Sequence, residues 1–426
     1  MKNQRHTRGI AEKFAKTFVV KVLGMGSGIV LSIVIGRHLG PEGLGVINLS
    51  LKIGMILIVV SLFGLQNWII REVSKSNKKG DYNYQRSLIS ASVITTAFLS
   101  FIIASLGIIG VNVIGDVFLD NDALKVPLTL TFIMLIPQTL SRVYSSALNG
   151  IGRVWQANLI DQSLTSILVL ALVTVFYFFE IDYSANLVLT GYLCSRFMLL
   201  CFVFLFWRHQ QRGEKTSFMS IGSMLKKGFP MMVITGTSSI YNNLDVVILA
   251  SLSDMEHVGY YSAGARLALA TSFVVQIVNS VLSPRIAGLY IAGDLQEMSV
   301  IVKKVGRVLL LLSIGMIIFF IIFGNNLLVM WGDQFIKAYP ILVILIVGQG
   351  IKIANSISGT LLLMCDYERE QAFLSISILF IYVILAYLLI LNFQGIGAAY
   401  ALLITIIIEN ISKVILVKRN IKVSLF

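Results

Sequence analysis

Long apolar runs recur along the whole chain, and each ends in a short cluster of glycine, proline, polar or charged residues. A helix needs about 20 mostly apolar residues to cross a bilayer. By that length the pattern predicts twelve membrane-spanning helices. They are expected at 14–36, 44–70, 87–110, 126–148, 155–179, 185–207, 229–252, 258–283, 305–325, 340–363, 372–392 and 396–417. The predicted fold class is therefore an all-α integral membrane protein.

Basic residues between these runs fall almost entirely on one side of the predicted membrane. With a cytoplasmic N-terminus, 25 of the 34 Lys and Arg residues lie on the inner side, three in outer loops and six within spans. Cytoplasmic loops of membrane proteins carry such an excess of Lys and Arg. We therefore expect both termini to be cytoplasmic, and we interpret the basic N-terminus as the start of an uncleaved first span.

The composition argues against several other classes of function. The net charge of +13 is spread over short loops, so it indicates topology rather than a nucleic-acid-binding surface. The three Cys and four His residues show no metal-ligand spacing, and the sequence contains no nucleophile–base pair and no phosphate loop. We therefore expect no enzymatic activity, no cofactor, no metal and no nucleic-acid partner.

A weak internal repeat lies at half the chain length. Residues 39–52 line up with residues 252–266 with one inserted residue, which matches Gly45 to Gly259 and Lys52 to Arg266. Six spans per half insert both halves the same way up. This predicts two six-helix bundles related by a pseudo-two-fold axis along the membrane normal, with a binding site at their interface. The predicted domains are 1–207 and 228–426, joined by a basic cytoplasmic linker at 208–227.

Nine charged residues fall inside the predicted spans. A charge at the centre of a bilayer costs about 2.5–3.5 kcal/mol on insertion scales, so such residues usually face a protein-lined, water-filled cavity. Six of the nine are cationic, and this excess favours an anionic guest. The set comprises Lys21, Lys52, Arg142, Arg196, Arg266, Lys352, Asp161, Asp245 and Glu409.

Lys52 and Arg266 are the strongest candidates for binding such a guest, since they occupy matching places in the two halves. Each lies roughly 13 Å into its helix from the outer side, near the middle of a ~30 Å core. The alternative is that each snorkels to the surface or pairs with an acid. For Lys21 the cavity-lining and snorkelling interpretations are equally open. The glycine-rich stretch 24–28 beside it indicates either close helix packing or a bending point.

Arg196, Lys352 and Glu409 also lie near mid-depth and are candidate cavity residues, although Lys352 and Glu409 could instead neutralise each other. Arg142 and Asp161 lie near the inner surface and are expected to be structural.

Asp245 lies on a polar stripe with Thr235, Ser238 and Asn242, at steps that place all four on one helix face. Together with Asn242 and Glu409, it is a candidate proton or sodium site. Pairing with Arg266 and polar contacts that join helices remain alternatives for this stripe.

Three stretches carry a resemblance to a known family. They are the run IGRHLGPEGLG at 35–45, the triplet NLD at 243–245 and the run VGYYSA at 258–263. The sequence resembles bacterial polysaccharide exporters of the Wzx type, in the superfamily that also holds lipid II flippases and multidrug-extrusion transporters.

The resemblance implies a flippase of the bacterial cytoplasmic (inner) membrane. Such a protein carries an undecaprenyl-pyrophosphate-linked oligosaccharide, the O-antigen repeat unit or a related glycan, from the cytoplasmic to the periplasmic leaflet. It implies alternating access, ion coupling by protons or sodium, and a glycan polymerase and chain-length regulator as partners. The family's cationic cavity maps onto Lys21, Lys52 and Arg266.

Two rival functions differ in what the sequence should contain. A multidrug-type cation antiporter should have an acidic, aromatic cavity, whereas the charges here are predominantly basic. A glycan polymerase or ligase needs a sizeable outer loop, whereas the longest predicted outer loop, around 111–125, has about fifteen residues.

Overall fold

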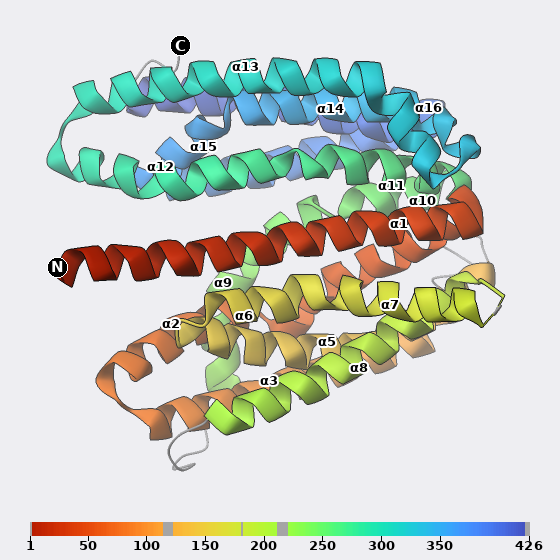
Figure 1. Ribbon diagram of the computed structural model, residues 1–426, viewed down its shortest axis with the longest axis horizontal. Helices are drawn as coiled ribbons and strands as arrows, with labels where there is room; N and C mark the ends of the chain where they lie inside the picture. The colour runs from red at the N-terminus through yellow and green to blue at the C-terminus, as the bar shows by residue number, and fades with distance from the viewer. Residues whose placement is uncertain (1, 114–121, 180–181, 211–219, 422–426) are drawn as a thin grey trace. The chain divides into compact units, whose positions relative to one another are not determined.

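The computed structural model describes residues 2–113, 122–179, 182–210 and 220–421. Every regular element in these ranges is a helix, so the prediction of an all-α protein is confirmed. Contacts between Cα atoms divide the chain into two compact units. Unit 1 comprises Met1–Leu39 and Val46–Asn243, and unit 2 comprises Gly40–Gly45 and Leu244–Phe426. Figure 1 shows the course of the chain through both units.

Unit 1 contains most of α1 and the helices up to α9. Their bounds are α1 (Lys2–Leu62), α2 (Leu65–Lys79), α3 (Tyr82–Ile109), α4 (Val111–Val113), η2 (Asp122–Leu124), α5 (Lys125–Gly150), α6 (Val154–Asn158), the π-helical η3 (Leu159–Ser163), α7 (Leu164–Phe178), α8 (Ala185–Gln210) and α9 (Ile221–Tyr241).

Unit 2 contains the remaining helices. Their bounds are α10 (Leu244–Leu252), α11 (Met255–Ala270), α12 (Ser272–Ala292), α13 (Leu295–Leu328), η4 (Val329–Trp331), η5 (Asp333–Ala338), α14 (Tyr339–Ala354), α15 (Ser356–Met364) and α16 (Glu368–Asn420).

The boundary between the two units lies after Asn243, so α9 belongs to unit 1. The sequence predicted the boundary earlier in the chain, at the linker 208–227. Close packing explains this placement, since α9 crosses the corner between α1 and α2. A Cβ on Gly228 of α9 would collide with Phe63 O, and a Cβ on Gly64 would collide with Gly228 O. Gly64 itself has a φ of 71°, a conformation that suits glycine. Residues 211–219 of the linker lie outside the described residues, and the predicted domain boundaries stay a prediction.

The described residues contain eight helices that are long and apolar enough to cross a membrane, or nine if the bent pair α6–α7 counts as one span. Two of these helices contain a kink. α1 has a non-helical residue at Gly40, where φ is 66°, and α16 has one at Gln394. The chain is therefore a multi-pass membrane protein, and the count of twelve spans stays a prediction.

Four predicted spans are interrupted in the structure, which corrects the expectation of single helices for 44–70, 155–179, 229–252 and 340–363. The interruptions lie at Phe63 and Gly64 between α1 and α2, at the bent η3, at Asn242 and Asn243 between α9 and α10, and at Asn355 between α14 and α15. α11 and α12 meet at Thr271, whose φ and ψ are helical, and together they form one apolar helix long enough to cross a membrane. Backbone groups at membrane depth must find partners in the protein or in a watery cavity. Interruptions of this kind are common where transporters bind their ligands.

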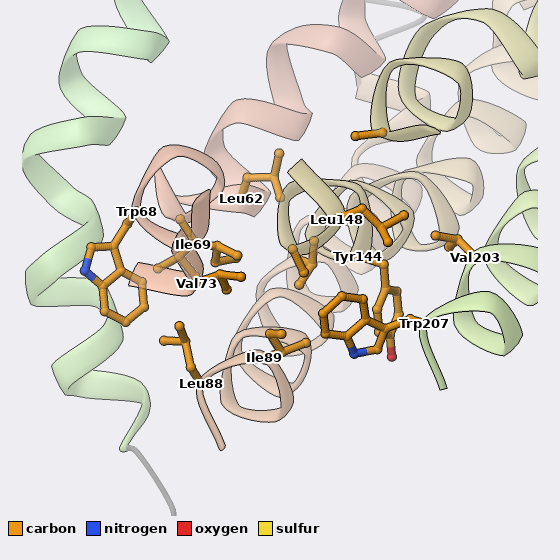
Figure 2. Close-up of a cluster of buried hydrophobic side chains, with 14 of the residues drawn as sticks. Leu62, Trp68, Ile69, Val73, Leu88, Ile89, Tyr144, Leu148, Val203 and Trp207 are labelled. Atoms are coloured by element: carbon orange, nitrogen blue, oxygen red, sulfur yellow. The ribbon is translucent and has the colours of Figure 1, made fainter. Parts of the chain in front are cut away.

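The core of unit 1 is built from apolar and aromatic side chains of α2, α3, α5 and α8. Figure 2 shows Trp68, Ile89, Tyr144 and Trp207 among the buried residues of this cluster. The helices approach closely, since a Cβ on Gly150 would lie 2.7 Å from Val73 Cβ. Small residues permit such contacts between helices in membranes.

In unit 2, α14 packs against both α13 and α16. A Cβ on Gly350 would lie 2.6 Å from Ile317 Cδ1 on α13, and one on Gly348 would lie 3.0 Å from Ile406 Cδ1 on α16. The two glycines therefore permit close helix contacts on opposite faces of α14. Figure 1 shows α13 and α14 running alongside each other.

Candidate functional site

The structure distributes the predicted site residues between the two units. Lys21, Lys52, Arg196 and Asn242 belong to unit 1, and Asp245, Arg266, Lys352 and Glu409 belong to unit 2. Among the described residues no group of three or more His, Cys, Asp or Glu side chains is arranged to hold a metal ion. The polar contacts of these residues are described below for each unit separately.

Lys52 is joined to the break between α9 and α10. Its Nζ donates a hydrogen bond of 2.9 Å to the main-chain carbonyl of Asn242, which lies just beyond the end of α9. The carbonyls at a helix C-terminus lack intrahelical partners and carry partial negative charge, which an ammonium group stabilises. The contact places a cation at a helix interruption, and it links two of the predicted site residues.

Lys21 lies in α1 at the point where α1 contacts the π-helical η3. The hydroxyl of Ser163 donates to Val20 O at 2.8 Å, and a Cβ on Gly24 would collide with the Ser163 side chain. α1 continues as a helix through residues 24–28, so Gly24 serves close packing, the first of the two alternatives for this stretch.

Arg142, Asp161 and Arg196 form a charged cluster inside unit 1. Arg142 Nε lies 2.9 Å from Asp161 Oδ1, which supports the structural role expected for this pair. Arg196 is 8% exposed and within electrostatic range of both partners. Asp161 lies in η3, where α6 and α7 meet at a bend of 42°. The cluster carries two positive charges and one negative charge at this bend.

Asp245 is in the first turn of α10, and its Oδ2 accepts a hydrogen bond of 3.0 Å from the Tyr261 hydroxyl on α11. The turn at Asn242 and Asn243 separates it from α9, so the predicted stripe does not continue along one helix. Thr235 bonds to Met231 O within α9. The side chain of Ser238 lies outside the described residues.

Glu409 pairs with a residue that the sequence interpretation assigned to the inner side. Lys413 Nζ lies 2.6 Å from its Oε1, one turn further along α16. Lys352 on α14 is within electrostatic range of Glu409, Lys413 and Asp245. The (i, i+4) spacing of Glu409 and Lys413 is a helix-pairing signal that was visible in the sequence.

An amide network accompanies these charges at the break between α14 and α15. Asn355 Nδ2 donates to Asn410 Oδ1 at 3.0 Å and to Asn410 O at 3.1 Å, and Ser358 donates to Asn355 Oδ1. Asn410 in turn donates to Ile406 O. The sequence reasoning missed Asn410, which directly follows Glu409. The network satisfies the side chains of Asn355 and Ser358 at this break and links it to α16.

Arg266 lies on α11, seven residues beyond Gly259, as Lys52 lies seven residues beyond Gly45. Two helical turns therefore separate each cation from its matched glycine, about 10 Å along the axis. The structure thus preserves in each half the spacing that the repeat predicts.

Comparison with known proteins identifies the family of this chain. The sequence model of a family described as polysaccharide biosynthesis protein matches residues 10–290. The chain belongs to this family. The resemblance to polysaccharide exporters, which rested on short runs of residues, is thereby confirmed.

Two relatives cover most of the chain. One is named as an O-antigen transporter of Shigella flexneri. It is 22% identical over 385 residues, which cover 88% of this chain and 90% of that protein. The other is named as a low-salt glycan biosynthesis flippase of Haloferax volcanii. It is 22% identical over 396 residues, which cover 92% of this chain and 80% of that protein.

Two solved structures share the fold of this family member. An inward-facing multidrug resistance transporter of the MATE family superposes with a TM-score of 0.78 at 14% identity, covering 93% of this chain and 94% of that one. The lipid II flippase MurJ, in an inward closed conformation, superposes with a TM-score of 0.75 at 13% identity, covering 94% and 87%. At these identities the similarity shows the fold alone.

Proposed function

We propose that this protein flips an undecaprenyl-pyrophosphate-linked oligosaccharide, such as an O-antigen repeat unit, from the cytoplasmic to the periplasmic leaflet of a bacterial inner membrane. The family match and the two relatives named as an O-antigen transporter and a glycan flippase support transport of a lipid-linked glycan. The predicted cytoplasmic position of both termini belongs to the same proposal.

The observation that carries the choice of an anionic substrate is the excess of cations within the predicted spans. Lys52 and Arg266 occupy repeat-matched positions, and Lys21, Arg196 and Lys352 add further positive charge. A pyrophosphate must leave water to cross a membrane, and Lys or Arg offers charge-assisted hydrogen bonds to it. The lipid tail stays in the bilayer while the pyrophosphate and sugars pass the cationic residues.

Movement between inward-open and outward-open states would transfer the head group without opening a continuous channel. We assign the coupling ion, a proton or sodium, to Asp245, with Asn242 and Glu409 as further members of the pathway. The hydrogen bond from Tyr261 supports this assignment, because it orients the Asp245 carboxylate at the start of α10. A glycan polymerase and a chain-length regulator would act on the product.

Cells that lack their own repeat-unit flippase and express this protein test the proposal. The expected result is restored surface glycan, with less lipid-linked repeat unit retained on the cytoplasmic side. The same cells should show unchanged resistance to organic cations. Resistance to such cations without restored glycan would contradict the proposal and favour a multidrug antiporter.

A further inference from the structure

Three charged side chains from three helices meet inside unit 1, and their charges do not balance. They are Arg142 on α5, Asp161 on η3 and Arg196 on α8. Among the described residues, the electrostatic neighbours of Arg196 are Arg142, Asp161 and Tyr192, and the phenol of Tyr192 is uncharged at neutral pH. Two guanidinium groups therefore share one carboxylate, which leaves one positive charge uncompensated.

The guanidinium of Arg196 is buried without an acceptor. The residue is 8% exposed, and its Nε and Nη1 atoms make no hydrogen bond to any described residue. The nearby carboxylate is already engaged, since Asp161 Oδ1 lies 2.9 Å from Arg142 Nε. A buried charge that lacks a partner is costly, and buried N–H groups nearly always have an acceptor. A negatively charged acceptor beside Arg196 would meet both requirements.

A second buried donor lies close to Asp161 in the chain. Thr165 follows Asp161 by four residues, about one helical turn, on α7, which packs against α8. Its hydroxyl is buried and makes no hydrogen bond to any described residue. Threonine hydroxyls inside helices commonly bond to the carbonyl four residues earlier, as Thr174 does to Leu170 O on the same helix. The exception at Thr165 coincides with the π-helical η3, which ends at Ser163, and π-helical turns are frequent at functional sites.

The cluster limits its ligand in size and in charge. The side chains of Arg142 and Asp161 are 22% and 15% exposed, so the cluster is not sealed, whereas Arg196 is buried. An ion that reaches Arg196 must therefore be small. One negative charge neutralises the cluster, whereas a divalent phosphate would replace the excess of positive charge by an excess of negative charge.

We propose that Arg142, Asp161 and Arg196 form a binding site for one small monovalent inorganic anion, for which chloride is the probe. The Arg196 guanidinium would donate a charge-assisted hydrogen bond to the anion, Arg142 would add a second positive charge, and Asp161 would weaken binding by repulsion. The bound anion would link α8 to η3, where α6 and α7 meet at a bend of 42°. The site belongs to the protein without its substrate, and the proposal does not depend on the glycan that the protein carries.

Thermal unfolding of the full chain, purified in detergent, tests the site in sodium chloride and in sodium gluconate at equal concentrations. We expect chloride to raise the melting temperature with a saturable dependence on its concentration, because a ligand that binds the folded state stabilises it. Arg196→Gln should weaken the apparent affinity for chloride about tenfold or more, as loss of a charged hydrogen bond does. Arg285→Gln is the matched control, since Arg285 forms an exposed ion pair with Glu297 and its variant should keep the wild-type affinity.

Asp161→Asn should change the affinity in the opposite direction, which a purely structural role of the cluster would not produce. The substitution removes the negative charge that repels the anion, so this variant should bind chloride several-fold more tightly than the wild type. Its loss of stability should accordingly be smaller in chloride than in gluconate.

A measurement on the wild type keeps the test decisive if a variant folds poorly. Crystals grown with bromide in place of chloride should show an anomalous-scattering peak at hydrogen-bond distance from the Arg196 guanidinium. The proposal is overturned if that peak is absent, or if chloride and gluconate give the same melting temperature. It is equally overturned if Arg196→Gln keeps the wild-type response to chloride, or if Asp161→Asn binds chloride more weakly.

Discussion

Gly45 and Gly259, which the internal repeat aligns with each other, pack backbone against backbone in unit 2. A Cβ on Gly45 would lie 3.1 Å from Gly259 N and collide with Met255 O. A Cβ on Gly259 would collide with Pro41 O. The repeat thus matches two residues that touch, at the point where the segment Gly40–Gly45 meets the start of α11.

Gly259→Ala should destabilise the protein by about 1–3 kcal/mol, since an added methyl group forces a backbone shift in a packed contact. The melting temperature of the purified protein measures the effect. Gly315→Ala on α13 is the matched control, because a Cβ there meets nothing within 4 Å. Equal melting temperatures for the two variants would refute the role of this contact.

The charged cluster at η3 predicts a stability effect that depends on which partner is removed. Asp161→Asn should destabilise by about 1–3 kcal/mol, because it leaves Arg142 and Arg196 facing each other without the carboxylate. Arg142→Leu combined with Asp161→Leu should cost less, since no unpaired charge remains from that pair. Thermal unfolding of both variants checks this order, and a less stable double variant would contradict it.

Reporter fusions test the predicted topology. Alkaline phosphatase fused within 208–227 should be inactive, since the basic residues there predict a cytoplasmic position. Fusion near Asp333, in a predicted outer loop, should be active and serves as the control. Active phosphatase in the first fusion would exclude the predicted orientation.

The sequence predicted the helical membrane fold because spans about 20 residues long dominate the hydropathy, but it did not predict where helices break. A single Asn355 within an apolar run hardly alters hydropathy averaged over a span. The partner that bonds to this side chain, Asn410, is 55 residues away. The partner of the Asn242 carbonyl, Lys52, is 190 residues away. Both breaks depend on contacts that only the folded chain forms.

The ion-pair partners of individual charged residues likewise depend on contacts that form only in the folded chain. The depth of Glu409 in its span was readable from the sequence, but the choice between Lys352 and Lys413 as its partner needed side-chain positions. The match of Lys52 to Arg266 followed from the repeat. The bond that Lys52 forms at the end of α9 did not, because no local pattern encodes it.

Lys52 and Arg266 should be required for glycan export if they bind the pyrophosphate. Lys52→Ala and Arg266→Ala should each sharply reduce surface glycan while membrane levels of the protein are retained. Lys52→Arg should be tolerated better, because it keeps the charge and can still donate to Asn242 O. Lys75→Ala is the control, since Lys75 is an exposed partner of Glu72. Normal export by both alanine variants would exclude these residues from substrate binding.

Asp245→Asn tests ion coupling, because it keeps the shape of the side chain and removes its charge. In reconstituted vesicles this variant should lose the dependence of transport on an ion gradient, or stop net transport, while lipid-linked glycan still binds.

Tyr261→Phe is the matched companion variant, since it removes the hydroxyl that donates to Asp245 Oδ2 and leaves the carboxylate in place. Coupling should therefore persist in Tyr261→Phe, with a changed dependence on ion concentration, because a hydrogen bond to the charged form favours that form. Gradient-dependent transport at the normal rate in Asp245→Asn would leave Asp245 as a structural partner of Tyr261, and the coupling ion would then have to bind elsewhere.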